Sequence, residues 1–172
     1  RNFETAPQHR MSTAYLSWEE RQLQTYTPSE LDSLYAHGFV ATRRDRGVFQ
    51  KTRSVRINTD KFELSSENRR VLKKTEGLEL ANHAIPYGAY HWTIGKMAKD
   101  FYSEKFGDGT FSANKDKELL TDSNHSSFNR LLSYSWPGRA EPIGYCIALE
   151  TKEFLHYCYP FYALADSLPL IA

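Results

Sequence analysis

Long apolar runs and cysteine are the two features that this sequence most lacks. No stretch of about 18 apolar residues occurs, and the first residues contain no hydrophobic region of the signal-peptide type. The two cysteines, Cys146 and Cys158, are too few for a disulfide scaffold and cannot form a metal site by themselves. We therefore expect a cytoplasmic protein with reduced thiols and no membrane partner.

Several familiar catalytic patterns are also missing. The sequence contains no P-loop, no HExxH helix and no Ser-His-Asp spacing. Gly107-Asp108-Gly109 is typical of a turn rather than of a phosphate-binding loop. No internal repeat or low-complexity tract occurs. These absences exclude the best-marked hydrolase, metalloprotease and nucleotidase classes.

Aromatic residues, in contrast, are abundant. The chain of 172 residues contains 11 Tyr, 10 Phe and 3 Trp, with 40% hydrophobic and 25% charged residues overall. These proportions are ordinary for a globular protein, and the length allows one domain or two closely packed halves. We expect a core rich in ring contacts. A turn at Pro86-Tyr87-Gly88 predicts two regions, 1–85 and 86–172.

Local signals place most of the helices. Thr27-Pro28-Ser29-Glu30 combines a capping threonine, proline at the first helical position and glutamate three residues after the cap, and Gly38 can end this helix. Apolar residues at helical spacing predict a second helix over 90–106, and 114–120 is expected to add a short one. Residues 1–17 are interpreted as an extended arm or strand because Pro7 interrupts them.

The strands are predicted from period-two patterns. Residues 39–58 read as strands around a polar turn at 43–47, with Val55 and Ile57 among the strand-forming residues, and 78–85 reads as another strand. Three further runs, at 128–136, 143–150 and 154–161, are joined by short links and predict an antiparallel meander. The expected fold class is α+β.

A strongly basic segment lies in the first half of the chain. Between Arg43 and Lys74, eleven Lys or Arg stand against four Asp or Glu, a net charge of +7 in a chain whose total is +1. Its last part, 62–75, predicts a helix capped by Ser65 or Ser66, in which Arg69, Arg70, Lys73 and Lys74 form a cationic surface. Such a surface attracts phosphate without reading sequence. The alternative is an ordinary solvated amphipathic helix.

The same segment carries a resemblance. Phe62, Ser65 and Arg69-Arg70-Val71-Leu72-Lys73-Lys74 match the F-x-x-S-x-x-x-R-R-V-L-[RK]-[RK] block of the aminoacyl-tRNA–protein transferases, the arginyl- and bacterial leucyl-transferase family. Other blocks that resemble this family are Thr5-Ala6-Pro7-Gln8, Tyr15-Leu16, Glu19-Glu20-Arg21, and Leu34 to Phe39 followed by Arg43. The resemblance is tight over 5–75 and loose afterwards, where Tyr134, Ile143-Gly144 and 157–160 fall at family positions.

The resemblance implies a fold and an activity. The family has an acetyltransferase-like (GNAT) fold, which here would be partial, with the meander following the helices. It moves an amino acid, Arg or Leu, from aminoacyl-tRNA to the amino terminus of an acceptor protein in an N-degron pathway of protein degradation. The implied partners are an aminoacyl-tRNA and an acceptor with an exposed amino-terminal Asp or Glu. No cofactor is implied.

The chain also departs from the family. The amino-terminal cysteine cluster is absent, so the zinc or iron–sulfur binding that it supports is not carried over, and His9 alone is no ligand set. Tyr159 stands where the family has aspartate before proline. The family continues past the position of Ala172 with a donor-binding turn and a G-Y-W region. The chain is therefore expected to be either a minimal form or one segment of a longer protein.

Site residues follow from the charge and from the resemblance. We predict that Arg56, Arg69, Arg70, Lys73 and Lys74 bind tRNA phosphates or a substrate carboxylate. The attacking amine must be neutral, which requires a base or a desolvated pocket.

The candidates for the catalytic roles are His125, Tyr134 and His156, each of which could instead be purely structural.

Two other functions remain open. A catalytically inactive module could keep the surface that recognises tRNA or an acidic amino terminus. A general acyl-CoA N-acyltransferase is a weaker possibility because the R/Q-x-x-G-x-G/A pyrophosphate loop is absent.

Overall fold

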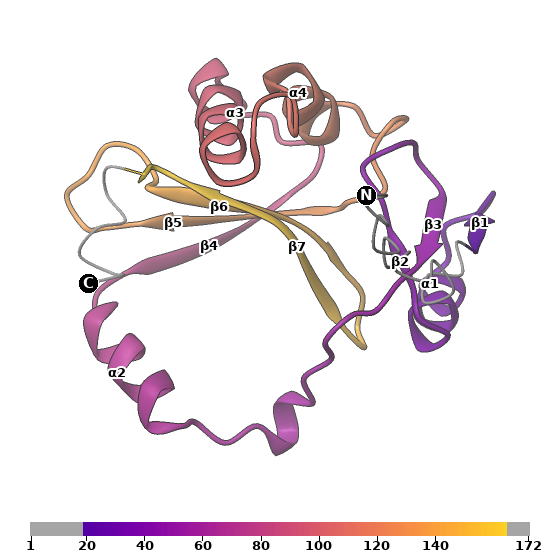
Figure 1. Ribbon diagram of the computed structural model, residues 1–172, viewed down its shortest axis with the longest axis horizontal. Coiled ribbons are helices and arrows are strands. Elements are labelled where there is room, and N and C mark those ends of the chain that lie inside the picture. Colours follow the sequence, from indigo (N-terminus) through magenta and orange to yellow (C-terminus); the bar gives the residue numbers. More distant parts are fainter. Residues whose placement is uncertain (1–18, 165–172) are drawn as a thin grey trace, which may run out of the picture.

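The computed structural model describes residues 19–164, in which helices and strands form a mixed α+β fold. A small antiparallel sheet has the order β1-β3-β2 and consists of β1 (Glu20–Gln22), β2 (Phe39–Ala41) and β3 (Val48–Lys51). Helix α1 (Pro28–Ala36) lies between β1 and β2 in the chain and beside this sheet in space (Figure 1). The arm predicted over 1–17 lies outside the described residues.

A larger antiparallel sheet follows, with the order β4-β5-β6-β7. Its strands are β4 (Glu79–Ala84), β5 (Arg130–Ser135), β6 (Gly144–Glu150) and β7 (Leu155–Tyr162). The last three confirm the predicted meander. Strand β4 pairs with β5, so one sheet contains strands from both predicted regions, 1–85 and 86–172. Helices α3 (Trp92–Phe106) and α4 (Ala113–Thr121) cover one face of this sheet (Figure 1).

Helix α1 has the boundaries that its capping residues predict. The Thr27 hydroxyl accepts a hydrogen bond from the Glu30 N–H, and the Glu30 carboxylate accepts one from the Thr27 N–H. Gly38 follows the helix with φ +85°, a conformation that costs glycine little. Because Leu31 and Tyr35 point into the core, the helix is held by packing as well as by its cap.

One hydrophobic core joins the two sheets. It contains Phe49 from β3, Tyr35 from α1, Phe101 from α3, and Leu131 and Ile147 from the larger sheet. The Tyr35 ring stacks on Phe154 with centroids 4.0 Å apart and meets Phe49 edge-on at 6.4 Å. The expected ring contacts therefore occur where the two sheets meet.

Residues 53–76, termed here the outer arc, leave this core and loop outward between β3 and β4 (Figure 1). They contain a 3₁₀ turn, Thr59–Lys61, and helix α2 (Ser66–Lys74), neither of which buries a residue. The strand expected around Val55 and Ile57 is wrong: both are in coil, with exposed fractions of 92% and 63%. Their β-branched side chains favour a strand, but no strand within residues 19–164 pairs with them.

No helix within residues 19–164 is both long and apolar enough to span a membrane.

Candidate functional site

Helix α2 is built by its own short-range contacts. Ser65 is the N-cap: its hydroxyl accepts from the Asn68 N–H at 3.1 Å, and the Asn68 side chain accepts from the Ser65 N–H at 2.9 Å. The N-cap prediction is thus confirmed at Ser65. The two apolar residues of the helix, Val71 and Leu72, are 43% and 55% exposed, so α2 presents every side to solvent.

The two arginines of α2 already have partners within the outer arc. Arg69 donates to the Leu64 carbonyl at 2.6 Å. Arg70 makes a bidentate ion pair with Glu67, with N–O distances of 2.7 and 2.6 Å. The hydrogen bond from Arg70 lowers the pKa of Glu67, and the same pair raises the pKa of Arg70. Glu67 therefore offsets one of the four cations of the helix.

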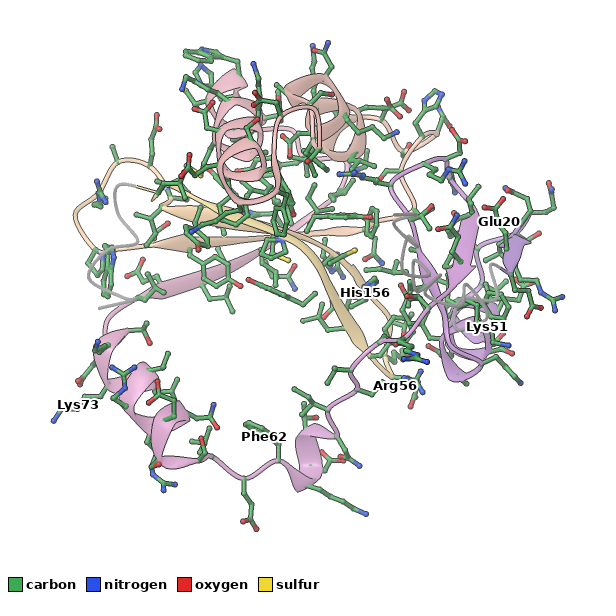
Figure 2. The ribbon with its side chains drawn as sticks, viewed as in Figure 1. Glu20, Lys51, Arg56, Phe62, Lys73 and His156 are labelled. Carbon is green, nitrogen blue, oxygen red and sulfur yellow. The ribbon has the colours of Figure 1, made fainter. Side chains whose placement is uncertain are left out.

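The lysines complete the cationic surface. Lys73 and Lys74 lie in the last turn of α2, where a positive charge suits the helix dipole. Figure 2 shows Lys73 pointing away from the sheets, whereas Phe62 points from the outer arc toward the space that it encloses. Lys73 therefore lies on the side of α2 that faces away from the sheets.

The other predicted cation, Arg56, has a mainly structural position. It lies near the start of the outer arc and donates to the Tyr35 carbonyl at the end of α1, 2.5 Å away. This contact ties the outer arc to the core. Arg56 is separated from α2 by the 3₁₀ turn and does not join its surface (Figure 2).

The basic window from Arg43 to Lys74 does not fold into one patch. Arg44 and Lys51 pair with Glu20 and Glu19, each at 3.3 Å. Arg43 lies over the Phe111 ring, with its guanidinium carbon 5.2 Å from the ring centroid. The net charge of this window was counted along the sequence, but in the fold its residues lie in two separate places. One is the junction of the sheets, and the other is the outer arc.

The three candidate catalytic side chains lie apart. His125 is exposed in the turn after α4, and its Nδ1 lies 2.8 Å from Asp122 Oδ2. This hydrogen bond raises the pKa of His125. Tyr134 is on β5, where its hydroxyl donates to the Tyr157 hydroxyl at 3.3 Å and burial raises its pKa.

His156 belongs to the junction of α1 with the larger sheet. Its Nδ1 lies 2.7 Å from the Tyr35 hydroxyl, and burial lowers its pKa. The Tyr35 hydroxyl also accepts the Ala41 N–H at 3.2 Å, so it joins His156 to β2. This imidazole is thus hydrogen-bonded to the core, and within residues 19–164 no hydrogen bond joins it to His125 or Tyr134.

Sequence reasoning missed one buried carboxyl group. Asp116 on α4 is fully buried, and neither of its oxygens has a hydrogen-bond partner within the described residues. Burial raises its pKa to about 7. No sequence signal marked it, because aspartate in a short amphipathic helix normally faces water.

A cavity was missed as well. It lies at the junction of the two sheets and is lined by Arg46, Arg130 and Lys152 together with serine and apolar side chains. Its residues come from five separate segments, which no spacing rule connects. Within residues 19–164 no cluster of three or more His, Cys, Asp or Glu could hold a metal ion.

Comparison of the chain with protein-family models, with curated proteins and with solved structures gave no match.

Proposed function

We propose that this chain transfers an amino acid, Arg or Leu, from aminoacyl-tRNA to the amino terminus of an acceptor protein, within an N-degron pathway. The observation that carries the proposal is α2: within the block Phe62 to Lys74, which resembles the transferase family, residues Ser66–Lys74 form a capped helix that buries no residue, and its Lys73 points away from the sheets. A tRNA backbone can approach such a helix without displacing any packed side chain.

The arrangement of the larger sheet supports a GNAT-like fold for the second half. Strand β4 is followed by α3 and α4 and then by the meander β5-β6-β7, and both helices cover one face. Helices followed by a meander are the order expected in the first part of a GNAT-like domain. In this proposal, an aminoacyl-tRNA replaces acyl-CoA as the donor.

The proposed reaction needs positioning more than strong acid–base catalysis. The neutral α-amine of an amino-terminal Asp or Glu attacks the ester carbonyl of aminoacyl-tRNA, a C–N bond forms, and the C–O bond to the terminal ribose breaks. The ribose hydroxyl leaves with a proton, and the amine loses one. Because the ester is already activated, holding both partners in place supplies much of the acceleration. Arginine side chains suit the acceptor carboxylate because they bind it bidentately.

A second candidate function is a binding module that recognises tRNA or an acidic amino terminus without catalysis. The separation of His125, Tyr134 and His156 favours it. His125 already pairs with Asp122, and His156 is committed to Tyr35. The Tyr134 hydroxyl instead meets Tyr157, so the described residues contain no assembled acid–base pair among these three.

A transfer assay separates the two functions. Purified chain is incubated with radiolabelled arginyl-tRNA or leucyl-tRNA and with peptides that begin with Asp or Glu, while matched peptides beginning with Lys or Arg serve as controls. Label in the acidic peptides supports transfer. Retention of tRNA on a filter without label in any peptide supports the binding module. If tRNA is not retained and no peptide is labelled, both transfer and a tRNA-binding module are contradicted.

A further inference from the structure

A cavity of about 640 Å³ lies between the start of α1, the β2–β3 turn, the α4–β5 loop and the β6–β7 turn. Neither α2 nor any other residue of the outer arc lines it. Its volume falls within the range of about 300–1,000 Å³ that is usual for small-molecule and cofactor sites. The cavity is therefore a second candidate site, separate from the cationic helix.

The inner wall of the cavity is apolar. It is formed by Leu31, Phe128 and Leu149, which belong to the buried core, and by the half-buried Ile85. A flat ligand body can pack on these side chains without displacing bound water from polar groups. The wall thus suits the apolar part of a ligand, such as a nucleotide base.

The rim of the cavity carries excess positive charge. Arg46, Arg130 and Lys152 line it against one carboxylate, Glu150, which forms an ion pair with Arg130. Arg46 uses one N–H to reach the Ser123 carbonyl at 2.8 Å, which leaves further donors on its guanidinium group. Lys152 is exposed, and its ammonium group makes no hydrogen bond or ion pair with any described residue.

Internal hydrogen bonds fix the polar walls in place. The Ser127 hydroxyl lies 2.9 Å from the Tyr26 hydroxyl and accepts the Gly47 N–H at 3.0 Å. The Arg46 guanidinium lies over the Tyr26 ring at 4.6 Å. Asn129 donates to the Glu150 carbonyl at 2.8 Å and accepts its N–H at 2.9 Å. The cavity is therefore formed before a ligand arrives, which lowers the entropy cost of binding.

We propose that this cavity binds one nucleoside monophosphate unit, with its base on the apolar wall and its phosphate between Arg46 and Lys152. A lone acidic side chain would reach the cations but leave the apolar wall uncovered. The nucleotide is either free or the terminal residue of an RNA, and the second source rests on the proposed function.

Titration calorimetry of the full chain with adenosine 5′-monophosphate at low salt tests this proposal. Binding is expected, with weaker binding by adenosine, which lacks the phosphate, and by inorganic phosphate, which lacks the base. Lys152→Ala should weaken the affinity about tenfold, the size of one charge-assisted hydrogen bond. Because the Lys152 ammonium group is exposed and holds no other element in place, this variant should fold normally. Lys99→Ala, an exposed lysine of α3, should bind like the parent chain.

Arg46→Ala provides a second variant, with circular dichroism to verify its fold because Arg46 also contacts Ser123. No binding of the monophosphate at millimolar concentration overturns the proposal. Equal affinity in the parent, Lys152→Ala and Arg46→Ala chains also overturns it. If a peptide that begins with Asp bound more tightly than the monophosphate, and both variants abolished this binding, the cavity would be assigned to the acceptor. The proposal of a nucleotide site would then be overturned.

The source of the nucleotide is resolved by competition. Displacement of a short RNA by the monophosphate, dependent on Lys152, identifies an RNA terminus, and failure to compete identifies a free nucleotide. Binding of the monophosphate itself is tested independently of the proposed function. If the chain transferred an amino acid but did not bind the monophosphate, only the cavity assignment would be overturned. If it bound the monophosphate but neither transferred an amino acid nor retained tRNA, only the proposed function would be overturned.

Discussion

At the scale of single residues, Asp116 is the group whose environment differs most from that of a typical surface residue of its type. It lies in the core near Tyr90, Tyr102 and Tyr145. The pKa of each of these tyrosines is raised mainly by burial and in addition by the negative charge of Asp116. A buried carboxyl group that has no hydrogen-bond partner within residues 19–164 favours its neutral form. Its ionisation should therefore oppose folding.

We predict that Asp116→Asn removes a pH dependence of stability. The pKa of Asp116 rises from 3.8 in the unfolded chain to about 7 in the folded protein. The folded state thus holds a proton that the unfolded state has lost, so stability falls as pH rises between these values, by about 4 kcal/mol in total. Urea unfolding at a pH of about 4.5 and of about 7.5, near the two ends of this window, should show the fall in the parent but not in the variant.

The control is Asp108→Asn, in the exposed turn after α3. It should keep the slope of the parent chain. Parallel stability curves for the parent and Asp116→Asn would contradict the assignment of a buried neutral carboxyl group.

At the scale of elements, α1 and α2 begin with the same capping chemistry but differ in packing. Both are nine residues long and have a reciprocal hydrogen-bond pair at the N-cap. Helix α1 buries Leu31 and Tyr35, whereas α2 buries nothing. Removal of the cap of α1 should therefore lower the free energy of global unfolding. Removal of the cap of α2 should affect only the local opening of that helix.

We predict that Ser65→Ala and Thr27→Ala separate these effects. Each variant loses about 1 kcal/mol of capping free energy. Thr27→Ala should lower the free energy of global unfolding by that amount, measured by urea denaturation. Ser65→Ala should leave the urea midpoint unchanged and speed hydrogen exchange of the α2 amides about fivefold. A shift of the midpoint by Ser65→Ala would mean that α2 packs on the rest of the protein.

We also predict that Arg69→Ala combined with Arg70→Ala weakens tRNA retention. The slope of log affinity against log salt should flatten by about one for each phosphate that the variant no longer neutralises. Lys99→Ala with Lys105→Ala, on exposed positions of α3, is the control with equal charge change. Unchanged retention in the α2 double variant would remove these arginines from the proposed site.

Glu67 supplies a prediction of the opposite sign. Glu67→Gln keeps the shape of the side chain but removes the charge that pairs with Arg70. The freed guanidinium should bind phosphate more strongly, so tRNA retention should rise at low salt, and the gain should vanish at high salt because exposed charges are screened. Filter binding at two salt concentrations measures it. A fall in retention would indicate that the ion pair itself shapes the surface.

The elements also show which features the sequence could predict. The caps at Thr27 and Ser65 depend on contacts three residues apart, so the pattern that predicts them contains the whole interaction. The strand expected near Val55 needed a distant partner, which none of the strands within residues 19–164 supplies. Likewise, the pairing of β4 with β5 joins Leu80 to Tyr134 across the two intervening helices, a contact that periodicity cannot indicate.

The same limit applies to the candidate sites. The cations of α2 are neighbours in sequence, so their common surface could be predicted, although the pairing of Arg70 with Glu67 was not. The cavity assembles Tyr26, Arg46, Phe128 and Lys152 from separate segments. Only tertiary packing brings such residues together, and their individual identities carry no signal.

At the scale of the whole molecule, the two sheets are joined by polar contacts around the shared core. The Thr151 hydroxyl donates to the Asp32 carboxylate at 2.6 Å, and Tyr35 links the Ala41 N–H of β2 to His156 of β7. Phe49 of β3 is fully buried beside the Tyr35 ring. The small sheet thus has no separate core, and the two sheets should unfold as one cooperative unit.

Tyr35→Phe tests this view because it keeps the ring and removes only the hydroxyl. The Ala41 N–H and His156 Nδ1 would both be left without a partner in a largely buried place, which should cost about 1–3 kcal/mol. Tyr157→Phe, whose hydroxyl meets Tyr134 on a half-exposed face, should cost less than about 0.5 kcal/mol. Hydrogen exchange should show the amides of β3 and β6 losing protection together in Tyr35→Phe, because one core serves both sheets. If β3 alone opened while β6 kept its protection, the small sheet would be an independent unit, and the cavity between the sheets would then open and close with it.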